Sequence, residues 1–188
     1  MRLGLLGGTF DPIHKGHLNA ATTACEALSL DRVLLTPSRI PPHRAEPRAS
    51  VFDRFAMVAL ATADDARLVP SDIEIQRPGV SYTVDTLDAL KAASPIAEFV
   101  LIVGSDTFPE MTGWREPERL FAMCEIAVVM RPGSDPARRD DPRVHRVPGA
   151  GLWISATEVR RRVAEGLEIA DLVGEGVARF VSKRDLYR

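Results

Sequence analysis

The chain has 188 residues, of which 45% are hydrophobic, 27% charged and 6% aromatic. This length predicts one domain, residues 1–188, that buries about 70% of its unfolded surface without metal or disulfide staples. The chain contains 24 Lys and Arg and 26 Asp and Glu, so its formal net charge is −2, which argues against nucleic acid as a ligand. The ordinary apolar content argues against disorder.

The sequence predicts no contact with a membrane. It contains no apolar run long enough for a span, which needs about 18 residues. The apolar stretch before Gly7-Gly8 is too short for the core of a secretion signal. Cys25 and Cys124 lie far apart in apolar surroundings, which is typical of reduced thiols. We therefore expect a cytoplasmic protein.

Apolar runs of strand length alternate with helically spaced apolar residues along the chain. In chain order we expect a strand at 3–6, a helix starting at Asp11-Pro12 and continuing through 18–28, a strand at 32–36, an exposed loop at 38–50, and a helix capped by Ser50. Short strands at 68–69 and 73–75, a helix at 83–93, strands at 98–103, 125–130 and 144–147, and helices at 116–123, 155–165 and 175–183 follow. This alternation predicts an α/β fold, a doubly wound, mostly parallel sheet with helices on both faces.

Residues that suit ligand binding follow several of the expected strands. They are Gly7–Phe10, Pro41–Arg44, Gly104–Asp106 and Arg131. Ligands of open parallel sheets bind beyond the carboxyl ends of the strands. The sequence therefore predicts the site at that edge of the sheet.

The most informative cluster runs from Gly7 to His17. Two glycines allow a close approach of the backbone, and the helix that follows offers free N–H groups to a phosphate. His14 and His17 are three residues apart, so on a helix they share one face, and with Lys15 they would form an anion cradle. A plain turn and a surface histidine pair are the ordinary alternatives. Two histidines without further ligands at the usual spacing do not predict a metal site, and the dinucleotide and P-loop fingerprints are absent.

Two motifs resemble a known superfamily. The segment GGTFDPIHKGH (7–17) resembles the (H/T)-x-G-H box of the nucleotidyltransferases, and ISATEVR (154–160) resembles their second box, I-S-S-T-x-I-R. Between them PPHR (41–44), DIEI (72–75), SYTVDTL (81–87), GSD (104–106) with Trp114, and RPG (131–133) resemble the bacterial nicotinate-nucleotide adenylyltransferases. The resemblance covers nearly the whole chain and departs from the usual pattern at Lys15, Arg44 and Ala156.

This resemblance implies a Rossmann-like nucleotidyltransferase fold and a reaction of ATP with nicotinate mononucleotide that gives nicotinate adenine dinucleotide and pyrophosphate. The nucleophile is a phosphate oxygen that is already ionised near neutral pH, since the second pKa of a phosphate monoester is about 6. No general base is needed. The site must instead hold two polyanions in line and stabilise the leaving pyrophosphate, which calls for donors.

The resemblance also implies roles for individual residues. His14, His17 and Arg160 would be catalytic. The ATP and phosphate contacts would come from Gly8, Thr9, Phe10, His43, Arg44, Gly104, Ser105, Asp106, Arg131, Ile154, Ser155 and Thr157. Ser155, Thr157 and Arg160 would form a second donor set, Gly104 and Asp106 would meet the ribose, and Arg131 would lie near the adenine. Tyr82, Thr83 and Trp114 would bind the nicotinate ring, and Mg²⁺ would arrive on the triphosphate.

Two other functions stay open on the sequence. A pantetheine-phosphate adenylyltransferase or a cytidylyltransferase would keep both boxes, but neither accounts for 81–87 and Trp114 together. A non-catalytic nucleotide-binding regulator would keep the fold without turnover. A homo-oligomer also stays open, because no heptad repeat or apolar patch stands out.

Overall fold

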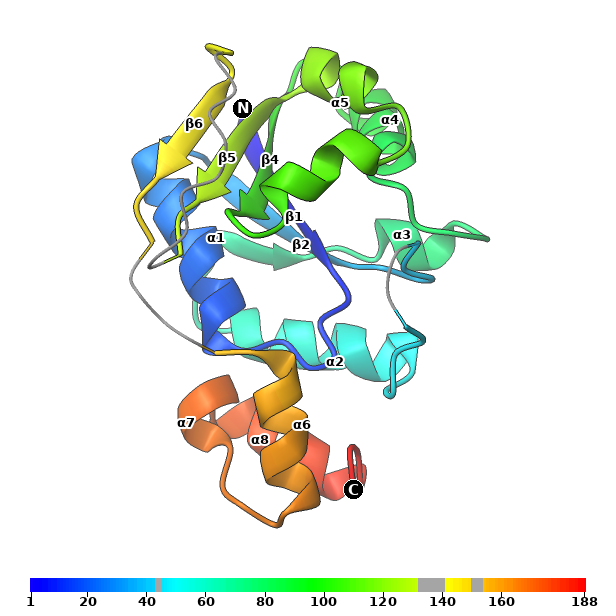
Figure 1. The fold of residues 1–188 in the computed structure, drawn as a ribbon, viewed down its shortest axis with the longest axis vertical. Coiled ribbons are helices and arrows are strands. Elements are labelled where there is room, and N and C mark those ends of the chain that lie inside the picture. Colours follow the sequence, from blue (N-terminus) through cyan, green and yellow to red (C-terminus); the bar gives the residue numbers. More distant parts are fainter. Residues whose placement is uncertain (43–44, 132–140, 150–153) are drawn as a thin grey trace.

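The computed structural model describes residues 1–42, 45–131, 141–149 and 154–188 (Figure 1). Strands and helices alternate as the sequence predicts. The elements are β1 (Arg2–Gly8), α1 (Lys15–Ala27), β2 (Arg32–Pro37), α2 (Val51–Thr62), β3 (Leu68–Pro70), α3 (Ile73–Gln76), α4 (Thr83–Ala93), β4 (Glu98–Gly104), the 3-10 helix η1 (Phe108–Gly113), α5 (Pro117–Met123), β5 (Glu125–Val129), β6 (Val144–Val147), α6 (Ala156–Ala164), α7 (Ala170–Val173) and α8 (Glu175–Lys183).

The strands form one sheet of six in the order β3-β2-β1-β4-β5-β6, and every pairing is parallel. The predicted doubly wound sheet is therefore confirmed, and it is fully rather than mostly parallel. The chain leaves β1 in one direction toward β3 and resumes on the other side of β1 with β4. Such a reversal opens a crevice at the carboxyl ends of the two central strands.

Helices cover both faces of the sheet. Buried side chains of α1, α2 and α8, among them Ala24, Met57 and Val177, pack on one face. Buried side chains of α4, η1 and α5, among them Leu87 and Phe121, pack on the other. The C-terminal helices α6, α7 and α8 gather at one end of the molecule beside α2, in orange to red (Figure 1).

Two local predictions are wrong. The expected strand at 73–75 is instead the short helix α3. The alternation of apolar and polar residues there suggests a strand with Glu74 facing solvent, but Glu74 and Ile75 are both buried, so the alternation does not mark the buried face. The helix expected to start at Asp11-Pro12 starts at Lys15, with His14 as its N-cap. Asp11 caps nothing, since its carboxylate accepts hydrogen bonds from distant partners described below. The short α7 and η1 were not predicted.

Within the described ranges, no helix is long and apolar enough to cross a membrane. Both cysteines, Cys25 and Cys124, are buried free thiols. Burial raises the pKa of the Cys124 thiol to about 11, so this sulfur stays protonated near neutral pH.

Candidate active site

A cavity of about 710 Å³ lies at the carboxyl ends of β1, β2, β4 and β5, where the sequence predicts the site. This volume is in the range of pockets that bind small molecules. Its walls come from the turn after β1, from the loops after β2 and β4, from the start of α4 and from the start of α6. The two sequence boxes, which are far apart in the chain, therefore face the same space.

The turn after β1 brings backbone close to the cavity. A Cβ on Gly8 would lie 3.2 Å from the Phe10 ring, and Phe10 itself has a left-handed φ of 48°. Arg54 of α2 supports this turn on the side away from solvent and is only 1% exposed. No sequence pattern singles out Arg54. Its guanidinium donates to the carbonyl oxygens of Thr9 at 2.6 Å and Ser38 at 2.7 Å. Arg54 thus ties together the chain segments that leave β1 and β2.

His14 and His17 stack, with ring centroids 3.7 Å apart and 22° between the planes. The backbone N–H of His14 donates to Nδ1 of His17 at 3.2 Å. Because Nδ1 of neutral His17 accepts this bond, its proton sits on Nε2, which is the nitrogen left to donate. His17 lines the cavity, with the edge of Phe10 beside it at a centroid distance of 5.0 Å.

Both imidazoles are neutral near pH 7. Loss of solvent lowers the pKa of His14 to about 4, helped by the positive charge of Arg131. The pKa of His17 is well below its usual value, first through desolvation and then through His14 and Arg131. Nδ1 of His14 is buried and has no hydrogen-bond partner among the residues that the structure describes. Of the expected anion cradle, only His17 lines the cavity, as a neutral ring, whereas His14 is buried and Lys15 is exposed, and neither is among the lining residues.

The second box begins α6. Ser155 is the N-cap of this helix, and its hydroxyl oxygen accepts the backbone N–H of Glu158 at 3.2 Å. Arg160 donates from Nη1 to the carbonyl oxygen of Asp11 at 2.7 Å and from Nη2 to the hydroxyl of Thr157 at 3.2 Å. The side of the box that lines the cavity is Ile154, Ala156 and Arg160, whereas Ser155 and Thr157 are exposed and not among the lining residues.

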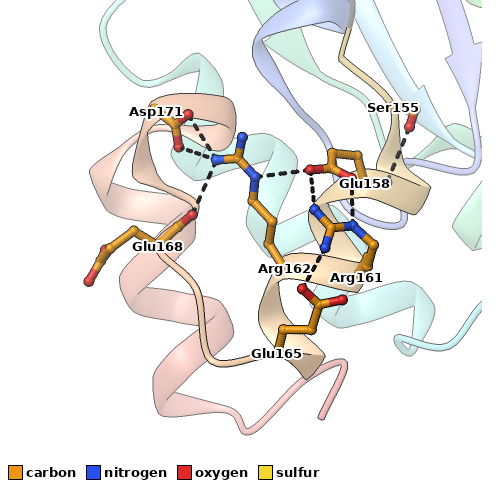
Figure 2. A network of polar contacts seen from close by, with 7 residues as sticks. All are labelled: Ser155, Glu158, Arg161, Arg162, Glu165, Glu168 and Asp171. Atoms are coloured by element: carbon orange, nitrogen blue, oxygen red, sulfur yellow. Dashed lines mark hydrogen bonds and ion pairs between the residues drawn. The ribbon is translucent and has the colours of Figure 1, made fainter.

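The two arginines after Arg160 belong to an exposed network. Figure 2 shows the Arg161 and Arg162 guanidinium groups turned toward acidic side chains of α6 and α7. Arg161 pairs with Glu158 at 2.8 Å, and Arg162 pairs with Asp171 at 3.0 Å. Arg162 also lies 3.1 Å from Glu158, and the hydrogen bonds from Arg161 and then from Arg162 lower the pKa of Glu158 to about 2. Of the three consecutive arginines, only Arg160 reaches the cavity.

The segment after β4 places a carboxylate against a cation. Asp106 Oδ2 lies 2.9 Å from Nη1 of Arg131. Both residues line the cavity together with Gly104, where a Cβ would collide with the Asp106 carboxylate. Ser105 is 2% exposed and is not among the lining residues. Its hydroxyl accepts the backbone N–H of Arg131 at 3.0 Å, so it supports Arg131 from behind.

The three residues expected at the nicotinate end all line the cavity. Tyr82 is the N-cap of α4 and Thr83 its first residue, and Trp114 follows η1. The guanidinium carbon of Arg115 lies 4.8 Å from the centre of the Tyr82 ring. Arg115 also lines the cavity and pairs with Asp85 at 3.4 Å. Arg115 is a cavity residue that the sequence motifs do not single out. Its position directly after Trp114, which is expected at the nicotinate ring, could have indicated it.

Glu74 is a second missed residue of the cavity wall. Its carboxylate accepts the hydroxyl of Thr86 at 2.7 Å, and burial raises its pKa above the usual range. His43 and Arg44 of the expected phosphate loop lie outside the described residues, as do Pro132 and Gly133, whereas Pro41 and Pro42 line the cavity. Among the described residues, no three or more His, Cys, Asp or Glu side chains are grouped so that they could hold a metal ion.

Comparison with known proteins agrees with this geometry. Residues 5–162 match the family model described as cytidylyltransferase-like. A Thermus thermophilus protein named "Probable nicotinate-nucleotide adenylyltransferase" is 43% identical over 189 residues, which cover 100% of both chains. A Desulfitobacterium hafniense protein of the same name is 40% identical over 198 residues, covering 100% of this chain and 96% of that protein.

Two solved structures share the fold. Plasmodium falciparum nicotinic acid mononucleotide adenylyltransferase complexed with NaAD has a TM-score of 0.83 at 18% identity, covering 99% of this chain and 97% of that one. The same enzyme complexed with APC has a TM-score of 0.81 at 18% identity, covering 99% and 96%.

Proposed function

The chain belongs to the cytidylyltransferase-like family and, within it, to the nicotinate-nucleotide adenylyltransferases, and on that premise we propose how its cleft joins the adenylyl group of ATP to nicotinate mononucleotide. The observation that carries the proposal is the meeting of the two boxes at one cavity. Arg160 of the second box hydrogen-bonds the backbone of the first box at Asp11, and His17 and Arg160 line the same wall.

The reaction is an in-line displacement at the α-phosphorus of ATP. A phosphate oxygen of nicotinate mononucleotide forms the new P–O bond, and the bond from the α-phosphorus to the bridging oxygen breaks, so the electron pair leaves with pyrophosphate. The attacking oxygen carries its negative charge before binding, so the chain needs donors rather than a base. We assign the Nε2–H of His17 as a donor to the phosphate oxygens on which charge builds up, because Nδ1 is engaged and His17 lines the cavity.

A neutral histidine suits this role. Because the pKa of His17 is low, its ring is neutral near pH 7 and carries a single proton. It offers this proton in a hydrogen bond and does not release it during the reaction. Positive charge is supplied instead by Arg131 and Arg160, which line the cavity. We assign Gly8, Thr9 and Phe10 to the backbone side of the triphosphate site. Ser155 and Thr157 then act indirectly, Ser155 by capping α6 and Thr157 by orienting Arg160.

Mg²⁺ belongs to the substrate ATP in this proposal. Two carboxylates that line the cavity are already engaged, since Asp11 accepts three hydrogen bonds and Asp106 pairs with Arg131. Mg²⁺ keeps several waters and favours substrate phosphates over a protein cage. The ion would therefore enter and leave on phosphate oxygens, with few protein ligands.

Two groups of lining residues suggest separate places for the two ends of the product. We assign the adenosine to Gly104, Asp106 and Arg131, and the nicotinate ring to Tyr82, Thr83 and Trp114. Trp114 offers an aromatic face to the pyridinium ring. Arg115 places a cation beside the same pocket, which favours a ring with a carboxylate over one with a neutral amide.

The reaction is tested by following both halves of ATP. The purified chain is mixed with Mg²⁺, nicotinate mononucleotide and ATP labelled at either the α- or the γ-phosphate. The α-label should appear in the dinucleotide and the γ-label in pyrophosphate. Binding of ATP without either product would support the non-catalytic regulator and overturn the proposal.

A further inference from the structure

The C-terminal end of the chain contacts the first box. Tyr187 is 7% exposed, and its hydroxyl donates to Oδ1 of Asp11 at 2.8 Å across 176 residues of sequence. Its ring belongs to the same buried cluster as Ile13, Val177 and Val181. Burial, and then the negative charge of Asp11, raise the pKa of Tyr187 far above its usual value, so the hydroxyl keeps its proton as a donor.

Asp11 is the point at which three segments meet. Besides Tyr187, its carboxylate accepts the backbone N–H groups of Arg48 at 2.8 Å and Ala49 at 3.1 Å, and its own carbonyl accepts Arg160 at 2.7 Å. Asp11 is 7% exposed. A buried carboxylate is costly unless donors surround it. The turn before His14 is therefore fixed by the loop after β2, by α6 and by the C-terminal residues.

We propose that Tyr187 is a positioning residue for adenylyl transfer, acting through Asp11 on the turn that leads into His14 and His17. Tyr187 does not line the cavity, so it touches no substrate. Loss of its hydroxyl would leave Asp11 Oδ1 with the Ala49 N–H alone. The turn would then be held less firmly against Arg160. The kinetic part of this inference rests on the proposed reaction.

The first test is Tyr187→Phe, which removes the hydroxyl and keeps the buried ring. We expect kcat to fall by about tenfold or more, as for a small displacement of catalytic groups, with KM for both substrates changed less than kcat. The matched control is Thr62→Val in α2. It removes another buried hydroxyl, which donates to the Val58 carbonyl at 2.9 Å and has no contact with Asp11. This control should keep its kcat, and both variants are compared at a temperature where circular dichroism shows them folded.

A double mutant shows whether Tyr187 acts through Asp11. If it does, Tyr187→Phe combined with Asp11→Ala should have the kcat of Asp11→Ala alone, because alanine at position 11 has already removed the acceptor of the Tyr187 hydroxyl. A general structural role predicts instead that the two losses multiply. Multiplying losses, or an unchanged kcat in Tyr187→Phe, would overturn the proposal.

Amide hydrogen exchange tests the same contact without turnover. In Tyr187→Phe the amides of residues 8–17 should exchange faster than in the wild type, while those of β5 should not. This readout separates the two proposals. If the wild type makes no dinucleotide but Tyr187→Phe shows the faster exchange, the proposed reaction is wrong and the role of the Tyr187–Asp11 contact stands. If exchange is unchanged in Tyr187→Phe, the role of that contact is wrong.

Discussion

The backbone N–H of His14 donates to Nδ1 of His17 at 3.2 Å, and the two rings stack at 3.7 Å. One contact thus sets both the tautomer and the orientation of His17. The two histidines can make this contact because His14 is the N-cap of α1 and His17 is the third residue of the same helix. We therefore expect His14 to act on the phosphates mainly through His17, since its own Nδ1 is buried and His14 is not among the residues that line the cavity.

Replacement of His17 by alanine should lower kcat by roughly 10²-fold, as for the loss of one donor to developing charge. The measurement is the initial rate of pyrophosphate release at saturating substrates. His145→Ala is the control, since His145 lies in β6 and pairs with Glu125 at 2.7 Å, away from the cavity. Near-wild-type turnover in His17→Ala would remove this side chain from the mechanism.

The depressed pKa of His14 predicts a loss of stability in acid. Folded His14 stays neutral down to about pH 4, whereas in the unfolded chain the same imidazole takes up a proton at the ordinary histidine pKa of 6.5. The unfolded state therefore binds more protons between these values, and the free energy of unfolding contributed by His14 falls as the pH drops from 6.5 toward 4, by about 3 kcal/mol in all.

Urea unfolding of the wild type and His14→Gln at several pH values measures this. Glutamine does not titrate, so the stability difference between the two proteins should shift in favour of His14→Gln as the pH falls. A difference that stays constant from pH 7 to pH 4 would mean that His14 titrates normally in the folded protein.

Arg160 and Arg161 offer a matched pair of neighbouring arginines. Arg160→Ala removes both the bond to the Asp11 carbonyl and a cation of the cavity wall, so kcat should fall by roughly 10²-fold. Arg161→Ala removes only exposed ion pairs, which contribute little to stability, and its kcat should not change. Equal effects of the two changes would contradict the assignment of Arg160 to the site.

Arg115 is expected to contribute to the choice of acid over amide. Arg115→Gln should raise KM for nicotinate mononucleotide about tenfold, equivalent to one charged contact of ~1.4 kcal/mol, and leave KM for ATP unchanged. Arg119→Gln is the control, because Arg119 pairs with Asp88 at 2.8 Å and does not line the cavity. An unchanged ratio of acid to amide turnover in Arg115→Gln would assign the preference to other groups.

Local patterns in the sequence predicted the sheet and most of the residues at its carboxyl edge. Short apolar runs such as 98–103 indicate strands buried between two helical layers. Gly104 ends one of these strands, and Asp106 and Arg131 come within two residues of a strand end. The same local information could not reveal what lies behind the site. Arg54 reads as a polar position of an amphipathic helix, yet it is buried against the carbonyl oxygens of two turns.

Asp11 shows the limit more sharply. An Asp-Pro pair before a helix predicts an N-cap, and only the tertiary structure brings Tyr187, Arg48 and Ala49 to its carboxylate. Contacts across such distances leave no periodic signal in a single sequence. Ser155, in contrast, was assigned to phosphate by resemblance, and its role as the N-cap of α6 follows from its local position alone.

The central claim is that the cleft transfers an adenylyl group specifically to nicotinate mononucleotide. The most direct test compares kcat/KM for pyrophosphate release from ATP and Mg²⁺ with nicotinate mononucleotide, nicotinamide mononucleotide and phosphopantetheine under the same conditions. We predict strong turnover with the first and little with the other two. Turnover with phosphopantetheine alone, or with no acceptor at all, would contradict it.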